Sequence, residues 1–411
     1  MSGRRLDMLS TVPYFTGCQA PPGAENMTRY LIVTWDGAGN LVPTLGIARH
    51  LVDAGHDVRI LGHDTIVKRC GEVGAKFIAL AQPEGWDKLD NPDDFEAELE
   101  LMMEQLCFST AIAKEVASEL GREAADVLMV DCMLWTALNV ALASGLPTAT
   151  LFHTPYTIFR GGPLVEMFAP GLVRLNAHRA ELGLDPVANL GAVHDACDLA
   201  LVALPMEFEP DAGDAPNVVR MGPVLDAPPL MKTTDAVDVS DGSTPLVLVS
   251  LSTSEQGQAE LLQRIVDAVA VLPVRAVVTT GPSIDPATVR AGENTRVVAY
   301  VPHAELLPST SLVITHAGLG TVMTALGNGV PLLCTPMGRD QFFNAEQVQA
   351  LGAGRMLMPG ADVSSITQAA REILNDAPCQ AAAKQMAITI SGYAGASGAV
   401  AALERLNLGR S

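Results

Sequence analysis

Residues 311–354 read SLVITHAGLGTVMTALGNGVPLLCTPMGRDQFFNAEQVQALGAG, and this stretch decides the fold assignment. Two short apolar runs, 312–314 and 330–334, have the length and composition of buried strands. A helix is predicted after each, from about Thr321 to an Asn-Gly stop and from about 344 to 352. A β-α-β-α succession of this kind predicts a parallel sheet in an α/β protein.

The first strand-to-helix turn of this stretch is suited to an anion. Gly318 and Gly320 allow the backbone to come close to a ligand. The helix that follows presents unpaired N–H groups and a partial positive charge, which favour phosphate. His316 and Thr321 add side-chain donors at the same place. The alternative for His316 is a strand-end histidine that only satisfies backbone groups.

Four segments of the stretch, THAGLGT, GVPLLCTP, DQFFNA and the closing GAG, together resemble the donor-nucleotide signature of family 1 glycosyltransferases. This group includes plant and macrolide glycosyltransferases, and the resemblance extends more loosely from Met27 onward. It implies two Rossmann-like α/β domains facing across a cleft, the GT-B architecture. It also implies an inverting, metal-independent transfer that needs no cofactor, with a uridine or thymidine diphosphate sugar as co-substrate.

Composition limits the partners of the chain. With 411 residues the chain is too long for one ordinary core, so two domains are expected. The net charge of -20 and the sequence pI near 4.7 argue against nucleic acid and anionic membranes. Seven cysteines occur without CxxC pairs, and no apolar run reaches the length of a membrane span. We therefore expect a cytoplasmic enzyme without a structural zinc site or stable membrane insertion; a homodimer is left open.

The expected domain organisation follows from changes in periodicity along the chain. The first domain is expected to contain a helix from about Thr44 to Ala54 and a long helix over 95–119. The predicted segments are an N-terminal extension, 1–27; an acceptor-binding α/β domain, 28–225; a linker, 226–244; a nucleotide-sugar-binding α/β domain, 245–390; and a C-terminal segment, 391–411, whose helix could pack back on the first domain.

The family resemblance assigns further donor contacts. Thr253 follows a predicted strand where relatives have a phosphate-contacting turn, and the nucleobase is expected near Val301. Asp340 and Gln341 are placed at the hydroxyl groups of the donor sugar, where a carboxylate beside an amide suits carbohydrate. The alternative for this pair is an N-terminal cap of the helix that follows.

The acceptor side departs from the family pattern. Relatives carry Gly-His ahead of a proline after the first strand, and that histidine deprotonates the acceptor; here the residue is Asn40. An amide is no base and can only orient a ligand. Asp131, at the strand end where relatives keep the acidic partner, is then the expected base, unless it only caps a helix. His153 and His63 stand at other strand ends and are further candidates, with His153 also an expected acceptor contact.

These residues favour transfer of a sugar to a hydrophobic small molecule, such as an aromatic natural product. The sequence leaves the acceptor, the sugar and the O-, N- or C-linkage open. Two alternatives remain, a nucleotide-sugar epimerase of the same fold and a non-catalytic protein that binds nucleotide sugars. On sequence alone, replacing Asn40 by histidine is expected to preserve or broaden activity on simple alcohols.

Overall fold

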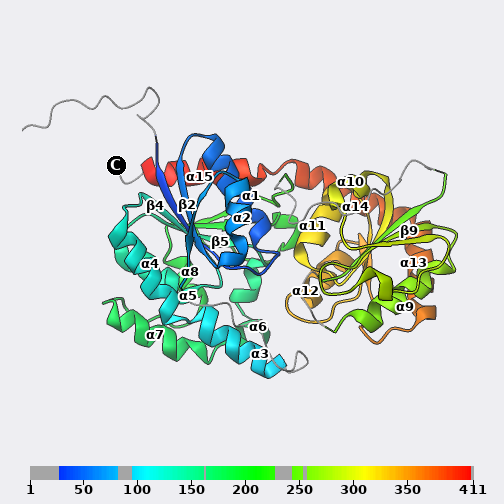
Figure 1. Cartoon of the computed structure of the whole chain (residues 1–411), viewed down its shortest axis with the longest axis horizontal. Helices are drawn as coiled ribbons and strands as arrows, with labels where there is room; N and C mark the ends of the chain where they lie inside the picture. Colours follow the sequence, from blue (N-terminus) through cyan, green and yellow to red (C-terminus); the bar gives the residue numbers. More distant parts are fainter. Residues whose placement is uncertain (1–26, 82–94, 162, 227–242, 253–256, 409–411) are drawn as a thin grey trace, which may run out of the picture.

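The computed structural model describes residues 27–81, 95–161, 163–226, 243–252 and 257–408, and the statements below concern these residues. They form two parallel sheets, each covered by helices on both faces, which lie side by side in Figure 1. The α/β class predicted from the sequence is confirmed. Most of the predicted linker and nearly all of the predicted N-terminal extension lie outside the described residues.

The first sheet has seven strands in the order β3-β2-β1-β4-β5-β6-β7, all parallel. Its central strands β1 and β4 are largely apolar, with charged residues only at one end, as expected for a parallel sheet that is buried on both faces. The strands are β1 (Arg29–Val33), β2 (Asp57–Gly62), β3 (Lys76–Ala79), β4 (Val127–Asp131), β5 (Thr148–Phe152), β6 (Leu199–Val202) and β7 (Val218–Arg220).

The helices of the first sheet follow the strands in turn. They are α1 (Leu41–Asp53), α2 (Val67–Glu72), α3 (Phe95–Met102), α4 (Thr110–Arg122), α5 (Trp135–Ser144), α6 (Pro163–Phe168), α7 (Gly171–Glu181) and α8 (Gly191–Asp195), with short 3-10 turns at Asp64–Ile66, Tyr156–Phe159 and Met206–Phe208.

The prediction of a single helix over 95–119 was wrong. The chain passes from α3 into a π-helical turn, Met103–Cys107, and breaks before α4. The hydroxyl of Ser109 accepts a hydrogen bond from the N–H of Ile112 at 3.4 Å and so caps the start of α4. The helix predicted from Thr44 begins earlier, at Leu41, directly after Asn40.

The second sheet has six parallel strands in the order β10-β9-β8-β11-β12-β13. They are β8 (Leu246–Ser250), β9 (Arg275–Thr279), β10 (Thr295–Val298), β11 (Thr310–Thr315), β12 (Leu332–Cys334) and β13 (Gly354–Met356). The helices are α9 (Ala259–Ala270), α10 (His303–Leu306), α11 (Leu319–Gly327), α12 (Gln341–Ala350), α13 (Val363–Asn375), α14 (Ala377–Ser391) and α15 (Gly395–Leu408), with 3-10 turns at Pro286–Thr288 and Leu307–Ser309.

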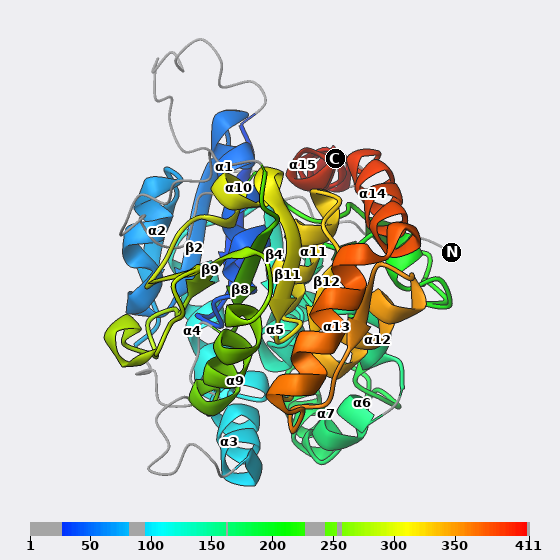
Figure 2. The ribbon, with the colours of Figure 1, turned by 90° about the vertical axis from the view of Figure 1, so that its right-hand side faces the viewer.

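Side chains of successive residues in β8 are buried on opposite faces of this sheet. Val247 and Val249 join the apolar cluster of α9 and α13, which cover the face turned to the viewer in Figure 2. Leu246 and Leu248 belong to the cluster that contains residues of α11, α12 and α14. Both faces of the strand are therefore buried, which explains its uninterrupted apolar sequence.

Both sheets reverse their strand order at the centre, between β1 and β4 in the first and between β8 and β11 in the second. Ligands of open parallel sheets bind beyond the carboxyl ends of the strands at such reversal points. In the first sheet this place is occupied by the β1–α1 loop and the end of β4, which carry Asn40 and Asp131. In the second it is occupied by the β11–α11 turn, which carries His316.

The C-terminal helices connect the two sheets. In Figure 1, α14 lies beside the second sheet and α15 runs back over the first, where it packs against α1. Ala399 and Leu403 of α15 are fully buried in the cluster that holds Leu45 and Ile47 of α1. The segment Ala377–Leu408 also has the length and composition of a membrane span, but these buried contacts account for much of its apolar character.

Candidate functional site

The carboxyl edges of the two sheets meet at the candidate site. Thr154, two residues beyond β5, donates its hydroxyl hydrogen to Oδ2 of Asp340 at 3.1 Å. Asp340 belongs to the second sheet, in the turn between β12 and α12. The end of β5 therefore lies next to the turn that the family resemblance places at the donor sugar.

The turn between β11 and α11 is shaped around the imidazole of His316. A Cβ atom on Gly318, the N-cap of α11, would lie 2.6 Å from His316 Nε2, so only glycine admits the ring at this position. Ala317 has a left-handed φ of 66°, a conformation that costs a non-glycine residue about 1 kcal/mol or more. Its carbonyl accepts a hydrogen bond from Nδ2 of Asn344 in α12 at 3.0 Å, which stabilises the turn.

His316 is a neutral donor at physiological pH. Burial, and to a lesser degree the charge of Arg339, lower its pKa to about 4. Its Nδ1 lies 3.4 Å from the hydroxyl of Thr315. The neutral ring can therefore donate a hydrogen bond to an anion, while Arg339 and the N-terminal end of α11 supply positive charge nearby.

The first turn of α11 is open toward a ligand. Helix geometry leaves its first N–H groups without a carbonyl partner one turn earlier. Gly320 is exposed, and a Cβ atom there would meet nothing within 4 Å. Thr321, next in the helix, is partly exposed. These two residues of the predicted phosphate site thus lie on the same helix end as Gly318.

Asp340 and Gln341 have different environments. Asp340 occupies the N-cap position of α12, but its side chain makes no capping hydrogen bond and instead accepts the bond from Thr154. Gln341 is 2% exposed, and its Oε1 accepts hydrogen bonds from the N–H groups of Met337 and Gly338 at 2.8 and 3.2 Å. The side chain of Asp340 therefore lies at the boundary between the two domains, whereas that of Gln341 stabilises the loop before α12.

The remaining predicted donor contacts lie near the end of β10 or cannot be placed. Val301 is buried, at the turn that leads into α10. In the same turn, Nε2 of His303 lies 3.2 Å from Oγ of Ser250 at the end of β8, and burial lowers the pKa of His303 to about 4. Thr253 lies outside the described residues.

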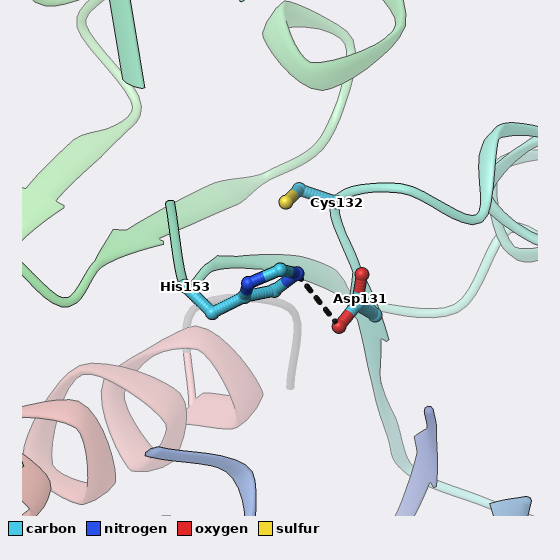
Figure 3. Close-up of side chains that lie close together, drawn as sticks. All are labelled: Asp131, Cys132 and His153. Carbon is cyan, nitrogen blue, oxygen red and sulfur yellow. Dashed lines mark ion pairs between the residues drawn. The ribbon is translucent and has the colours of Figure 1, made fainter. Parts of the chain in front are cut away.

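On the first sheet, Asp131 and His153 form a pair (Figure 3). Nε2 of His153 lies 3.3 Å from Oδ2 of Asp131, and the side chains are 13% and 1% exposed. Asp131 is the last residue of β4 and is in register with Leu151 of β5. His153 follows Leu151 by two residues, and because strand side chains alternate, it extends from the same face of the sheet.

The surroundings of this pair favour the charged forms of both side chains. Burial alone would raise the pKa of Asp131, but the charge of His153 and hydrogen bonds from His153, Met133 and Asn40 hold it below its usual range. Burial likewise opposes the charged form of His153, yet the carboxylate of Asp131 raises the pKa of His153 well above its usual value. A carboxylate facing an imidazolium is the expected state at neutral pH.

Asn40 has a structural position beside this pair. It is 1% exposed, and its Nδ2 donates to Asp131 Oδ2 at 3.1 Å, to the Trp35 carbonyl at 2.9 Å and to the Thr34 hydroxyl at 3.3 Å. Its Oδ1 accepts the N–H of Gly37 at 3.0 Å. These bonds fix the β1–α1 loop against the end of β4. They use the whole amide, so Asn40 orients Asp131.

Cys132 completes the cluster in Figure 3. Its Sγ, one nitrogen of His153 and one oxygen of Asp131 all lie within 4.8 Å of one another. These are ligand types that Zn²⁺ takes, although burial raises the pKa of Cys132 and keeps the thiol protonated. The carbonyl of Cys132 accepts a hydrogen bond from Nε2 of the buried His194 at 2.9 Å, which holds this backbone in place.

Three features of the site were missed in the sequence: the pairing of His153 with Asp131, the Thr154 contact to Asp340, and the charge of Arg339 beside His316. The first had a signal, because strand-end residues of adjacent parallel strands meet at one edge. The structure does not bring His63 to this cluster. It follows β2, which is separated from β4 by β1.

Comparison with known proteins finds a family model, sequence relatives and solved structures that are similar to this chain. Residues 263–394 match the family described as erythromycin biosynthesis protein CIII-like, C-terminal domain. The L-demethylnoviosyl transferase of Streptomyces niveus is 26% identical over 377 residues, which is 87% of this chain and 93% of that protein.

Solved structures with the same fold include the glycotransferase of kitacinnamycin, with a TM-score of 0.79 and 22% identity, covering 92% of this chain and 99% of that one. The glycosyltransferase VinC in complex with DTDP has a TM-score of 0.72 and 19% identity, covering 93% and 100%. At these identities the structural likeness establishes the fold.

Proposed function

We propose that this chain, a family 1 glycosyltransferase with the GT-B fold, transfers a sugar from a nucleoside diphosphate to a hydrophobic small molecule. The nucleotide sugar binds the second domain at the β11–α11 turn, and the acceptor binds the first domain at the ends of β4 and β5. The S. niveus relative and the kitacinnamycin protein bear names from natural-product pathways, which supports an acceptor of that class.

The observation that carries this proposal is the β11–α11 turn. A neutral His316, held against Gly318, stands beside a helix end whose first N–H groups are available and whose Gly320 is open. The diphosphate is the part of the donor that such a site recognises, because its oxygens accept hydrogen bonds and its charge is favoured by the helix end. Arg339, whose charge acts on His316, adds positive charge on this side of the site.

These groups also supply what the reaction demands of the donor domain. As the bond from the sugar C1 to the phosphate oxygen breaks, negative charge grows on the departing diphosphate. The N–H groups of α11, the His316 ring and Arg339 stabilise that charge in the role that a divalent cation has in other transferases. Asp340 accepts hydrogen bonds from sugar hydroxyl groups and holds the ring in the orientation needed for attack.

Attack by the acceptor from the face of the sugar opposite the diphosphate inverts C1. The arrangement favours this course, since the donor turn is on the second sheet and the proton-accepting groups are on the first. The hydrogen bond between Thr154 and Asp340 shows that the two sets of residues approach closely. Uridine and thymidine are the proposed bases; the DTDP bound to VinC supports thymidine. We also propose that the enzyme works in the cytoplasm.

The test is a thermal-shift and transfer assay with UDP-, TDP- and GDP-sugars and a panel of phenols. A donor at a hundred times its Kd raises the free energy of unfolding by about 2.7 kcal/mol, which is a readily measured shift. The proposal expects binding of a pyrimidine donor, lost in His316→Ala, and a glycosylated product. An epimerised nucleotide sugar would support the epimerase alternative, and binding without turnover on any acceptor would support a non-catalytic protein.

A further inference from the structure

We propose that His153 is the general base of the transfer and that Asp131 is its positioning residue. This inference rests on the proposed function. It assigns the proton-accepting role to the end of β5, because the loop after β1 carries Asn40 in this chain. The observations that carry it are the exposure of the two side chains, the hydrogen bonds of Asp131, and the contact between the neighbouring Thr154 and Asp340.

Asp131 is not placed to reach an acceptor itself. Its Oδ1 accepts the N–H of Met133 at 2.9 Å, and its Oδ2 faces both Asn40 Nδ2 and His153 Nε2. The side chain is 1% exposed, compared with 13% for His153. Any group that gives a proton to this pair must therefore approach the imidazole, and the carboxylate acts on it from behind.

Other nearby side chains do not fit the role. Asn40 has no basic lone pair. His194 is 1% exposed, sits among aromatic rings and is hydrogen-bonded to the Cys132 carbonyl. His316 and His303 belong to the donor domain, on the side of the leaving group. Among the described histidines, His153 is the one that combines a carboxylate partner with a place at the interdomain boundary.

The donor sugar would lie next to His153. Thr154 follows His153 directly, so their Cα atoms are about 3.8 Å apart. The Thr154 hydroxyl is 3.1 Å from the carboxylate that we assign to the sugar hydroxyl groups. One short segment thus contacts the sugar site with one residue and places the base with the previous one. The ring of Trp35 packs edge-on to His153, with centroids 6.3 Å apart, and limits its movement.

The reactive form is neutral His153, which forms when the resting imidazolium gives its Nδ1 proton to solvent. Its Nε2–H donates to Asp131, which leaves Nδ1 as the proton acceptor. The acceptor hydroxyl gives its proton to Nδ1 while its oxygen forms the new bond to the sugar C1. The bond from C1 to the phosphate oxygen breaks, and its electron pair leaves with the nucleoside diphosphate. His153 ends as an imidazolium paired with Asp131, and solvent removes the proton before the next turnover.

The charged state of the resting pair predicts the pH dependence. The titratable groups that face His153 are Asp131 at the end of β4 and Cys132, the next residue. Asp340 is hydrogen-bonded to Thr154, the neighbour of His153 in the chain. Because Asp131 raises the pKa of His153, the neutral base accumulates only as pH rises, so kcat/KM increases through that pKa. Removing the carboxylate in Asp131→Asn lowers the pKa of His153, which moves this limb of the profile to lower pH.

The experiment compares His153→Gln and Asp131→Asn with the control His56→Gln. His56 also pairs with a carboxylate, Glu404 at 3.1 Å, but away from the candidate site, where α15 meets the first sheet; its side chain is 6% exposed. For His153→Gln we expect kcat to fall by about a hundredfold or more with donor affinity unchanged. Dinitrophenol, which is already ionised at neutral pH, should be glycosylated at close to the wild-type rate. His56→Gln should keep the wild-type kcat, pH profile and donor affinity.

Two results would overturn the inference. One is wild-type kcat in His153→Gln on an un-ionised phenol. The other is an Asp131→Asn variant whose pH profile keeps the wild-type acidic limb. Calorimetric titration with the nucleoside diphosphate checks that each variant is folded. If wild-type protein bound donor and made product but His153→Gln were fully active, only the base assignment would fall. If wild-type protein bound no donor, the proposed function would fall first.

Discussion

Replacing Gly318 by alanine tests the donor site at its most closely packed point. The backbone of Gly318 has φ −60° and ψ 132°, so alanine is allowed there and only the new methyl group matters. That methyl would lie 2.6 Å from Nε2 and 2.8 Å from Cε1 of His316, compared with about 3.4 Å or more for ordinary contacts. Since His316 is 8% exposed, the ring has little room to retreat.

We expect two effects of Gly318→Ala. Overpacking should lower the free energy of unfolding by about 1–3 kcal/mol. Displacing the ring from the diphosphate should remove one hydrogen bond to a charged group, about 1.5–3 kcal/mol, which raises the Kd for the nucleoside diphosphate roughly tenfold to a hundredfold. Calorimetric titration and chemical denaturation measure the two quantities on the same sample.

Two further variants isolate the cause. In Gly318→Ala/His316→Ala the clash is absent, so the stability loss should be smaller than in Gly318→Ala alone, a non-additivity that a double-mutant cycle detects. Gly320→Ala, where the methyl meets nothing within 4 Å, should leave the unliganded protein as stable as the wild type or more so. Wild-type stability and wild-type donor affinity in Gly318→Ala would refute the packing argument and the assignment of His316 to the diphosphate.

Three other predictions follow from the same contacts. Asp340→Asn should lower kcat/KM about tenfold to a hundredfold by weakening hydrogen bonds to the sugar, while the Kd of the sugar-free nucleoside diphosphate, measured by calorimetry, stays unchanged. Asn40→His should destabilise the protein by about 2–4 kcal/mol in denaturation, because a larger ring cannot replace the four hydrogen bonds of a buried amide; retained stability would contradict this. Acidification from pH 6.5 to 4 should lower the free energy of unfolding. The cause is that His194, His303 and His316 have folded pKa values of about 4, so in this window the unfolded chain binds protons that the folded chain does not. A flat curve of stability against pH would contradict the burial of these three histidines in the neutral form.

The sequence predicted the sheets better than it predicted the contacts between them. Apolar runs such as 246–250 and 312–314 are strands in the structure because a doubly covered parallel sheet buries both of their faces. The long helix expected over 95–119 failed because helical periodicity continues through 103–109, where a π turn and the cap by Ser109 shift the register. A local pattern carries little information on such a shift.

The site was predictable where it depends on local chain geometry. Gly318 and His316 are close in sequence, and the turn that joins them follows from the glycine and the helix start. The contacts of His153 and Thr154 were not visible in the sequence, because they join strands and domains that are far apart along the chain. The expectation that Asn40→His would be tolerated is an example. It assumed an open loop, whereas the amide of Asn40 is buried and hydrogen-bonded in the structure.

A crystal structure with TDP or UDP bound would test the central claim most directly. The account predicts that the diphosphate lies at the first turn of α11, within hydrogen-bond distance of the His316 ring and of backbone N–H groups beside Gly320. Diphosphate density elsewhere, with the β11–α11 turn unchanged and empty, would contradict it.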